Sequence, residues 1–427
     1  MFRKIESASQ REDAGLGTHR TKISSHRAHR RRFPGHLATG ILPAATRGPA
    51  GPIVVDFQIS EHAAERGVSR AREHVASLIP SDAPMRKLDA SGNTEERWLS
   101  SCEPGSPTSR ALLDAIIVGG GPAGLSAALV LGRCLRHVLV CDAGHPRNEP
   151  ARIFNGFLSR DGSTPAEFLQ ICRDQLRRYE TIEFRKVKVV DVERGDCRFT
   201  AILETGERVT GRMLLLATGL VDELPQIENF RQFYGSTVHS CPYCDGWECR
   251  GQPIAVIGCN QESLDLAIEL LLWSKDLVLC TNGPLKVERK AVETFKRLCI
   301  RIIDTPIALL EGAGDKLEGI RFTDSSFLPR SAVFFSPGQY QRSPLAEQLG
   351  CEFCEENNCI QCGEDTATNV PGLYAAGNAS RGVQLVIAAA AEGMQSAFAI
   401  NNALLEADAE TGALKNSPES ARPNLNT

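Results

Sequence analysis

The sequence predicts an α/β fold with two domains, in each of which helices cover both faces of a parallel sheet in three layers. Two strand–helix–strand units carry this prediction, one over residues 114–141 and the other over 253–280. In each unit an apolar run of strand length ends at a glycine, and helical spacing and a second apolar run follow. This alternation is typical of parallel sheets, because a crossover helix must return the chain before the next strand begins.

The individual elements follow from apolar spacing and from helix-capping residues. Apolar runs predict strands at 114–118, 137–141, 183–192, 198–203, 213–216, 253–257 and 277–280. Helical spacing predicts helices at 122–132, at 262–273 and from about 382 to 406. A further helix is predicted to begin after Thr164, because Thr164 and Glu167 have the spacing of a capping box and Pro165 suits the first helical position.

A glycine-rich loop joins the first strand to the first helix. Gly119 would allow a tight turn, Gly121 would let the backbone approach a pyrophosphate, and Gly124 would permit close packing of helix and strand. The following helix would direct its N-terminal amides and positive dipole end at the phosphates. The candidate pyrophosphate-binding residues are therefore Gly119, Gly121, Pro122, Ala123 and Gly124.

Later segments favour FAD over NAD as the dinucleotide. Asp142, which ends the second strand, supports dinucleotide binding in general, because a carboxylate there can accept hydrogen bonds from ribose hydroxyls. Residues 217–219 close a strand in the way that flavin-binding two-domain proteins return to their first domain. A helix predicted to begin near 382–384 would direct its positive end at a flavin ring and stabilise negative charge on it. The further candidate flavin-binding residues are Asp142, Ala217, Thr218, Gly219, Gly377, Asn378, Val383 and Gln384.

Cys241 and Cys244 form a C-x-x-C motif just before the second unit, and Asp245 follows them. Two intervening residues let the sulfurs close a small disulfide ring and let one thiol resolve a mixed disulfide formed by the other. Asp245 could move protons to or from a thiolate. The rival interpretation is half of a zinc site, which needs two more ligands. His239 is near, but we interpret it as a loop residue.

The chain holds fifteen cysteines, and no apolar signal segment precedes them, so we expect reduced thiols in the cytoplasm. Cys351, Cys354, Cys359 and Cys362 have the spacing C-x2-C-x4-C-x2-C, which could bind zinc. The four-residue gap is short for two zinc knuckles, so we interpret these residues as incidental or buried thiols and predict no metal site. The cysteines predicted to be buried hydrophobes are Cys249, Cys259 and Cys280.

Charge is distributed unevenly. Residues 1–110 hold 17 Lys and Arg against 12 Asp and Glu, whereas the remainder holds 31 against 40. The acidic remainder argues against nucleic acid as its partner. The sequence contains no run of eighteen apolar residues, so we predict no membrane span. We interpret 1–110, with one short predicted helix at 61–78, as a disordered extension or an over-extended translation start; a transit peptide or nucleic-acid arm is the alternative. Residues 409–427 are predicted to be a polar tail.

Four motifs, in this order, resemble those of the low-molecular-weight thioredoxin reductases, a family of FAD-dependent disulfide oxidoreductases. The motifs are residues 119–124, 217–219, 241–246 and 377–384. The resemblance covers about residues 111–408 and implies a homodimer with two Rossmann-like nucleotide-binding domains, the second inserted into the first. It assigns 111–222 and 341–408 to the FAD-binding domain and 223–340 to an NAD(P)-type domain that carries the redox cysteines.

The same resemblance implies a role for each residue of the redox motif. Cys244 would be the thiol that faces the flavin, Cys241 would exchange with the substrate disulfide, and Asp245 would be the acid and base. Electrons would move between FAD and a thioredoxin-like protein, or a small dithiol or disulfide. A flavin-holding interaction protein without turnover is the alternative of another class.

The sequence departs from the family pattern at three places, the first two of which leave the electron donor or acceptor open. Asn260 stands where a second glycine should let a phosphate approach. Residues 281–283 lack the arginine pair that holds the 2′-phosphate of NADPH. Asn378 replaces the usual aspartate but can still form hydrogen bonds. Relatives that lack the NADPH signature, which are ferredoxin-dependent reductases and oxygen-dependent dithiol oxidases, are similar to this chain in that respect.

Overall fold

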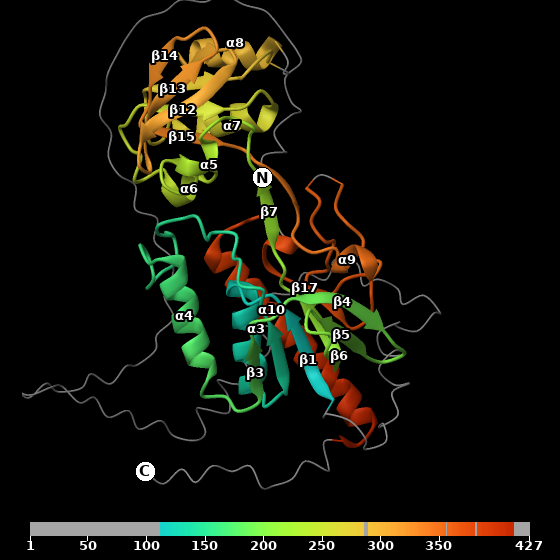
Figure 1. Cartoon of the computed structure of the whole chain (residues 1–427). Coiled ribbons are helices and arrows are strands. Elements are labelled where there is room, and N and C mark those ends of the chain that lie inside the picture. Colours follow the sequence, from blue (N-terminus) through green and yellow to red (C-terminus); the bar gives the residue numbers. More distant parts are fainter. Residues whose placement is uncertain (1–111, 286–288, 356, 381, 414–427) are drawn as a thin grey trace, which may run out of the picture. The chain divides into compact units, whose positions relative to one another are not determined.

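The computed structural model describes residues 112–285, 289–355, 357–380 and 382–413 (Figure 1). The extension predicted for residues 1–110, including its helix at 61–78, lies outside the described residues. So does most of the polar tail predicted for 409–427. Among the residues that are described, no helix is both long and apolar enough to cross a membrane.

The first sheet is formed by two distant parts of the chain. In the described residues it has seven strands in the order β3-β2-β1-β6-β5-β4, and β17 pairs with β6. The strands are β1 (Leu113–Val118), β2 (Val138–Cys141), β3 (Ile182–Arg185), β4 (Val189–Arg194), β5 (Phe199–Leu203), β6 (Arg208–Leu216) and β17 (Leu373–Ala375). Pairing is parallel from β3 to β6 and between β6 and β17, and it is antiparallel from β6 through β5 to β4.

The second sheet lies in the chain between β6 and β17, and its pairing is parallel throughout, in the order β11-β10-β9-β15-β8. Its strands are β8 (Val238–His239), β9 (Ile254–Ile257), β10 (Leu277–Cys280), β11 (Arg301–Ile303) and β15 (Ala332–Phe335). The smaller antiparallel sheets contain β12 (Ile307–Ala313), β13 (Lys316–Phe322) and β14 (Phe327–Pro329), and β7 (Leu220–Glu223) paired with β16 (Gly338–Gln341). The predicted α/β class with two Rossmann-like domains is confirmed, although the first sheet is mixed rather than parallel throughout.

The helices are mostly short, apart from the last one. They are α3 (Pro122–Arg133), α4 (Pro165–Leu176), α5 (Phe230–Phe233), α6 (Pro242–Asp245), α7 (Gln261–Leu270), α8 (Arg289–Arg297), α9 (Leu345–Gln348), the 3-10 helix η1 (Gly377–Ala379) and α10 (Val386–Glu410). Helix α4 begins as predicted, because the Thr164 side chain accepts a hydrogen bond from the Glu167 amide at 3.1 Å.

Strand β1 is buried on both faces of the first sheet. Ala115 and Ile117 belong to a core cluster with α3 and α10, whereas Ile116 and Val118 belong to a separate cluster on the opposite face. Since successive side chains of a strand point to opposite faces, a continuous apolar run is what a strand between two covering layers requires. The apolar run that predicts β1 therefore also explains why both faces of this strand are buried.

Helices α3 and α10 lie side by side (Figure 1) and approach each other unusually closely. A Cβ at Gly393 of α10 would overlap the backbone carbonyl of Ala123 in α3. At the far end of α10, Asp408 is only 8% exposed and binds Arg136 at 2.6 Å and Arg212 at 2.7 Å. This ion-paired end explains why α10 continues to Glu410, beyond the predicted end near residue 406.

Several sequence predictions of element boundaries are wrong, and β6 begins at Arg208 rather than 213. The strand predicted at 183–192 is two strands, because β3 pairs in parallel with β2 whereas β4 pairs antiparallel with β5, so the chain must change direction between them. Helix α7 ends at Leu270 rather than 273. Helix α10 begins at Val386 rather than near 382–384, because Leu385 is in an extended conformation and Gln384 is hydrogen-bonded to Gln339.

The close approach of α10 to α3 should tolerate no added side-chain atom at Gly393. We expect Gly393→Ala to lower the free energy of unfolding by about 1–3 kcal/mol, because the overlap with a backbone carbonyl outweighs the ~1 kcal/mol that alanine gains in a helix. Denaturant unfolding measures this difference, and Asn402→Ala on the exposed side of the same helix is the control. A Gly393→Ala protein as stable as the wild type would contradict this account of the helix pair.

Candidate active site

The predicted glycine-rich loop lies where β1, β6 and α3 meet. Gly119 has a φ of +113°, and a Cβ there would overlap the Ala217 carbonyl. The Ala217 amide donates to the Val118 carbonyl at 2.9 Å, which brings residues 217–219 against the loop. Two of the predicted motifs, about a hundred residues apart in sequence, are therefore neighbours in the structure.

The N-terminus of α3 is open. Gly121 is the N-cap, with an extended backbone and no side-chain hydrogen bond to the first amides of the helix, and a Cβ there would have no neighbour within 4 Å. Pro122 occupies the first turn, and Gly124 lies so close to the Gly119 carbonyl that only glycine fits. Free amides and the positive dipole end therefore point into open space, an arrangement that fits a phosphate group.

Asp142 lies beside this loop, at the end of β2. Its Oδ1 accepts hydrogen bonds from the amides of Gly120 and Gly144, both at 3.2 Å. A cavity of about 500 Å³ adjoins Asp142 and extends past Phe184 and Lys186 toward the start of α4. Its volume is within the range of ligand pockets, so the loop and this cavity together could hold a dinucleotide.

Some of the predicted C-terminal flavin-binding residues lie near the start of α3, and others do not. Gly377 has a φ of +75°, and a Cβ there would lie 3.0 Å from the Ala123 side chain, which places η1 against the start of α3. The Gly377 amide donates to Glu392 at 2.8 Å, and Asn378 is the next residue of η1. Val383 is 63% exposed, and the side chain of Gln384 is bound to Gln339 rather than free at a helix end.

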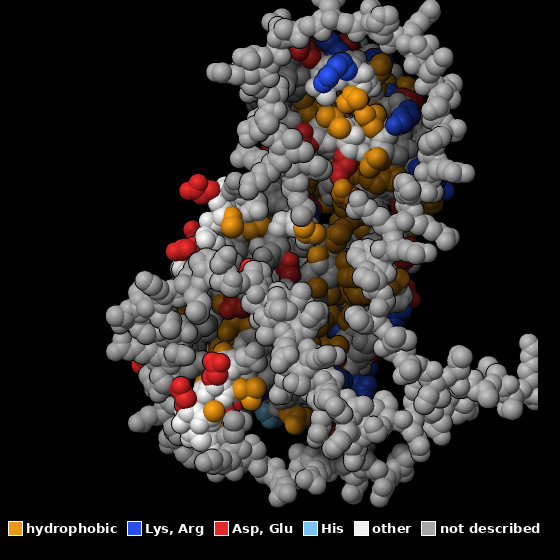
Figure 2. Space-filling view, turned by 180° about the vertical axis from the view of Figure 1, so that it is seen from behind, with side chains coloured by type: hydrophobic (Ala, Val, Ile, Leu, Met, Phe, Trp, Pro, Cys, Tyr) orange, Lys and Arg blue, Asp and Glu red, His pale blue; other side chains and the backbone are white. Residues whose placement is uncertain are grey.

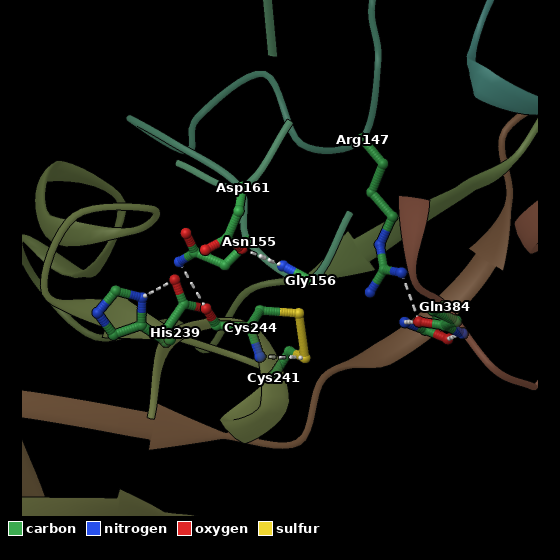
Figure 3. The surroundings of a disulfide bond; sticks show 10 residues. Arg147, Asn155, Gly156, Asp161, His239, Cys241, Cys244 and Gln384 are labelled. Atoms are coloured by element: carbon green, nitrogen blue, oxygen red, sulfur yellow. Dashed lines mark hydrogen bonds and ion pairs between the residues drawn. A yellow bond between two sulfur atoms is a disulfide. The ribbon is translucent and has the colours of Figure 1, made fainter. Parts of the chain in front are cut away.

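Cys241 and Cys244 are joined by a disulfide (Figure 3). Cys241 is the N-cap of the short helix α6, and its Sγ accepts a hydrogen bond from the Cys244 amide at 3.2 Å. Both residues are partly exposed. The hydrogen bond from the Cys244 amide orients the Cys241 sulfur at the start of α6.

His239 forms an ion pair that the sequence interpretation missed. It lies in β8 rather than in a loop, is 8% exposed, and places Nδ1 3.3 Å from Asp245 Oδ1 (Figure 3). Burial favours a neutral ring, but the Asp245 carboxylate and the Cys249 sulfur outweigh burial and raise the pKa of His239 to about 9. At neutral pH a cation therefore holds the Asp245 carboxylate in place next to Cys244.

Asn155 is a second residue that sequence spacing did not reveal. Its Nδ2 donates to the Cys244 carbonyl at 2.9 Å, from the loop between β2 and α4 (Figure 3). The nearby Asp161 accepts a hydrogen bond from the Gly156 amide at 2.8 Å, which fixes this loop. A lone asparagine in a loop carries no periodic signal, so only the structure could identify it.

A third missed feature is a polar network centred on Asp222 of β7. Arg147 donates two hydrogen bonds to its carboxylate, at 2.7 and 2.8 Å, and Gln339 and Tyr234 each donate one at 2.8 Å. Burial alone would raise the pKa of Asp222, but these donors outweigh it and lower the pKa. Arg147 also binds Gln384, so the network reaches a predicted flavin-binding residue.

The second nucleotide-type loop differs from the first at its helix cap. Asn260 is the N-cap of α7, and its Oδ1 accepts a hydrogen bond from the Ser263 amide at 3.1 Å. The amide that would bind a phosphate in an open loop is therefore already bound. At the end of β10, Asn282 accepts from the Ile307 amide at 2.7 Å, and Thr281 donates to the Gly283 carbonyl at 2.6 Å.

The four later cysteines do not gather around one point. Within the described ranges, no group of three or more His, Cys, Asp or Glu side chains could hold a metal ion. Cys351 and Cys359 are buried, whereas Cys354 and Cys362 are partly exposed. Of the three cysteines predicted to be buried, Cys249 and Cys280 are, but Cys259 is only partly buried, because it lies in the loop before α7.

The raised pKa of His239 predicts a pH-dependent stability. The protonated ring should stabilise the fold fully below its ordinary value of 6.5, and this contribution should be lost as the pH rises through 9. We expect the stability advantage of the wild type over His239→Gln to shrink by roughly 1–3 kcal/mol between about pH 6 and pH 10. Denaturant unfolding at both pH values tests this; exposed His137→Gln is the control, and a pH-independent difference would contradict it.

Several known proteins are similar to this chain. Thioredoxin reductase sirT of Leptosphaeria maculans is 29% identical and aligns over 70% of this chain and 97% of its own length. The crystal structure of HlmI is 35% identical, with a TM-score of 0.69 over 73% of this chain and 98% of that one. TrxB of Bacillus anthracis is 32% identical, with a TM-score of 0.66 over 69% of this chain and 99% of that one.

The match to a protein family covers the part of the chain that contains the two sheets. The family described as pyridine nucleotide-disulphide oxidoreductase matches residues 113–393. This range includes the glycine-rich loop, the C-x-x-C motif and the segment at 377–384. The chain therefore belongs to the pyridine nucleotide-disulphide oxidoreductase family, as a thioredoxin reductase-like, FAD-dependent oxidoreductase that acts on sulfur groups.

Proposed function

We propose that this enzyme moves two electrons between FAD and a disulfide of a thioredoxin-like protein through Cys241 and Cys244. The observation that carries the proposal is the closed Cys241–Cys244 disulfide at the start of α6, next to the His239–Asp245 ion pair. A partly exposed disulfide with an acid beside it has the parts that thiol–disulfide exchange needs. Twelve other cysteines in the described residues are thiols, which supports work in the reducing cytoplasm.

The residues proposed to hold FAD fit such a group. The open amides at the start of α3, those of Gly121 and Ala123, would bind the pyrophosphate, and the Asp142 carboxylate would accept hydrogen bonds from ribose hydroxyls. Residues 217–219 and 377–378 line the same end of the sheet and would contact the rest of the cofactor. When bound, FAD supplies a centre that takes up or releases two electrons.

The cysteines would reduce a partner in two exchanges once their disulfide has been opened. The Cys241 thiolate attacks a sulfur of the partner disulfide, so a mixed disulfide forms and the first partner thiolate leaves. The Cys244 thiolate then attacks Cys241 Sγ and releases the second. The partner gains two electrons and two protons, and Cys241–Cys244 returns to a disulfide. Asp245, held by His239, would pass protons at this site.

An exposed apolar surface near the motif suits a protein partner. Tyr243, inside the motif, is 68% exposed, Trp247 is 64% exposed, and Leu272 is 78% exposed. The Tyr243 ring lies 6.1 Å from that of Trp273, next to Leu272 in sequence, so Tyr243 lies close to that segment. Exposed aromatic side chains of this kind are typical of protein interfaces.

A second candidate function concerns the other end of the electron transfer. Asn260 already binds the Ser263 amide, and residues 281–283 offer no arginine, so a standard NADPH site does not fit. This observation supports a reductase that takes electrons from ferredoxin, or an oxidase that passes electrons from a dithiol to oxygen. In the oxidase direction the same two exchanges run backwards.

A homodimer is the proposed assembly. Ile387, Met394, Phe398 and Leu405 of α10 are 40–58% exposed and recur at helical spacing, so they share one face. Figure 2 shows hydrophobic side chains gathered in a band on the face opposite to that seen in Figure 1. An exposed apolar stripe on a helix is a feature that a second copy of the chain could cover.

The open cap of α3 makes a sharp prediction about flavin. Gly121 has an extended backbone that alanine can adopt, so Gly121→Ala should fold with a stability within about 1 kcal/mol of the wild type. Its methyl group would occupy the proposed phosphate space, and we expect flavin affinity to fall by about tenfold or more. Flavin absorbance of the purified protein measures occupancy. Gly195→Ala, whose Cβ would lie 3.5 Å from the Arg198 side chain and 3.7 Å from its carbonyl, should bind flavin normally.

Anaerobic titration of the purified enzyme tests the function. We expect a dithiol to bleach the flavin absorbance of the wild type, and Cys244→Ser to slow this at least ~100-fold, because a single thiol cannot complete the exchange. Exposed Cys299→Ser is the control. Bleaching of Cys244→Ser at the wild-type rate would sink the proposal.

The same titration separates the electron donors. Slow or absent bleaching by NADPH and NADH, with bleaching by a dithiol and peroxide formed in air, supports the oxidase. Bleaching by reduced ferredoxin, followed by reduction of thioredoxin, supports the ferredoxin-dependent reductase. Rapid bleaching by NADPH would show that the capped loop at Asn260 opens for a phosphate.

A further inference from the structure

Cys354 and Cys359 face each other across a β-hairpin. The Cys354 amide donates to the Cys359 carbonyl at 2.8 Å, and the Gln361 amide donates to the Glu352 carbonyl at 2.8 Å. Phe353 and Ile360 form an antiparallel bridge between these two hydrogen bonds. Cys354 and Cys359 are therefore the next opposed pair toward the tip of the hairpin.

This opposition is expected to place the two Cα atoms within the range that a disulfide can join. Residues directly opposite in an antiparallel pair point to the same face, and in a hydrogen-bonded pair their Cα atoms are about 5.5 Å apart. Disulfides join Cα atoms that are about 4.4–6.8 Å apart. The two side chains also interact electrostatically. Burial is the largest cause that raises the pKa of Cys359, and the Cys354 side chain raises it further. Both residues are thiols in the structure.

The hairpin is attached to the segment proposed to bind flavin. The Ile360 amide donates to the Ala379 carbonyl at 2.8 Å, and Gln341 Nε2 donates to the carbonyls of both Ala379 and Asn358. Cys359 Sγ lies 4.0 Å from the Asn378 carbonyl. A bond formed at this hairpin would therefore act directly on η1.

The two cysteines differ in exposure. Cys359 is 1% exposed, whereas Cys354 is partly exposed. A reagent in solution can therefore reach Cys354 but not Cys359. The buried thiol can react only with a sulfur already attached to its neighbour, which is the position of a resolving cysteine.

We propose that Cys354 and Cys359 are a second dithiol–disulfide site, separate from Cys241–Cys244, which low-molecular-weight disulfides oxidise. The Cys354 thiolate attacks the small disulfide, forming a mixed disulfide and releasing one small thiol. Cys359 gives up its proton and attacks Cys354 Sγ, so the second small thiol leaves. The protein loses two electrons and two protons, and the small disulfide becomes two thiols. The site would report the state of the small-thiol pool to the flavin-binding segment.

The other two cysteines of the motif provide matched controls. Cys351 is buried, and burial raises its pKa to about 11. Cys362 Sγ lies 3.6 Å from the Ile360 carbonyl and 3.9 Å from the Ala375 carbonyl. The same register would place Cys351 opposite Cys362, but the Cys351 amide binds the Ala346 carbonyl and the Glu352 amide binds Asn369, both outside the hairpin. The hairpin pairing is therefore not continued to Cys351, and we expect oxidation to be selective for Cys354 and Cys359.

The full-length protein incubated with oxidised glutathione tests the site. Free thiols are trapped by alkylation, the protein is digested, and mass spectrometry identifies each cysteine. We expect a Cys354–Cys359 cross-link and the loss of two alkylatable thiols. Cys359→Ser should stop at a glutathione mixed disulfide on Cys354, and Cys354→Ser should leave Cys359 alkylated under denaturing conditions. Cys362→Ser should cross-link like the wild type.

The result does not depend on the proposed function, because the Cys241→Ser/Cys244→Ser double variant should form the same cross-link. A stable mixed disulfide on Cys354 in the wild type would overturn the proposal. So would a cross-link to Cys351 or Cys362, or full alkylation of both residues after exposure to oxidised glutathione. A failure of flavin bleaching with a normal cross-link would count against the proposed function alone.

Discussion

The structure depends on how closely the backbone approaches the start of α3. Gly124 lies against the Gly119 carbonyl, Gly119 against the Ala217 carbonyl, and Gly393 against the Ala123 carbonyl. Each approach requires the absence of a Cβ, and together they bring three distant parts of the chain to one helix end. The same geometry leaves the first amides of α3 uncapped. A helix end of this kind favours an anion, because unpaired amides and the dipole act in the same direction.

The second nucleotide-type unit shows that this fold does not by itself produce a phosphate site. Strand β9 and helix α7 repeat the arrangement of β1 and α3, and Gly258 takes the place of the first glycine. Asn260 then supplies its own cap to the Ser263 amide. The amide that one unit leaves for a ligand is used by the other for its own stability. One side chain therefore decides between a binding site and a structural helix cap.

The surroundings of the redox cysteines are organised by pairs of opposite charge. The charge on His239 holds the Asp245 carboxylate in place beside Cys244, and Arg147 is paired in the same way with Asp222 in β7. Ionised groups that are partly buried need partners, because burying an unpaired ion costs roughly several kcal/mol. Asn155, which holds the Cys244 carbonyl, adds a neutral contact at the same place. Polar contacts thus help to fix the site.

The sequence by itself determined the parts of this protein that depend on neighbouring residues. The apolar run of β1, the open glycine cap of α3, the Thr164 cap of α4 and the C-x-x-C motif are all set within a few positions of chain. Neighbouring residues did not determine that the predicted strand at 183–192 is split. The split follows from the different strands with which β3 and β4 pair. Only the tertiary structure placed His239 against Asp245, Asn155 against Cys244, and Cys354 opposite Cys359. Caps and periodicity act over one or two turns of chain, whereas these contacts exist only after distant segments have been brought together by the sheets.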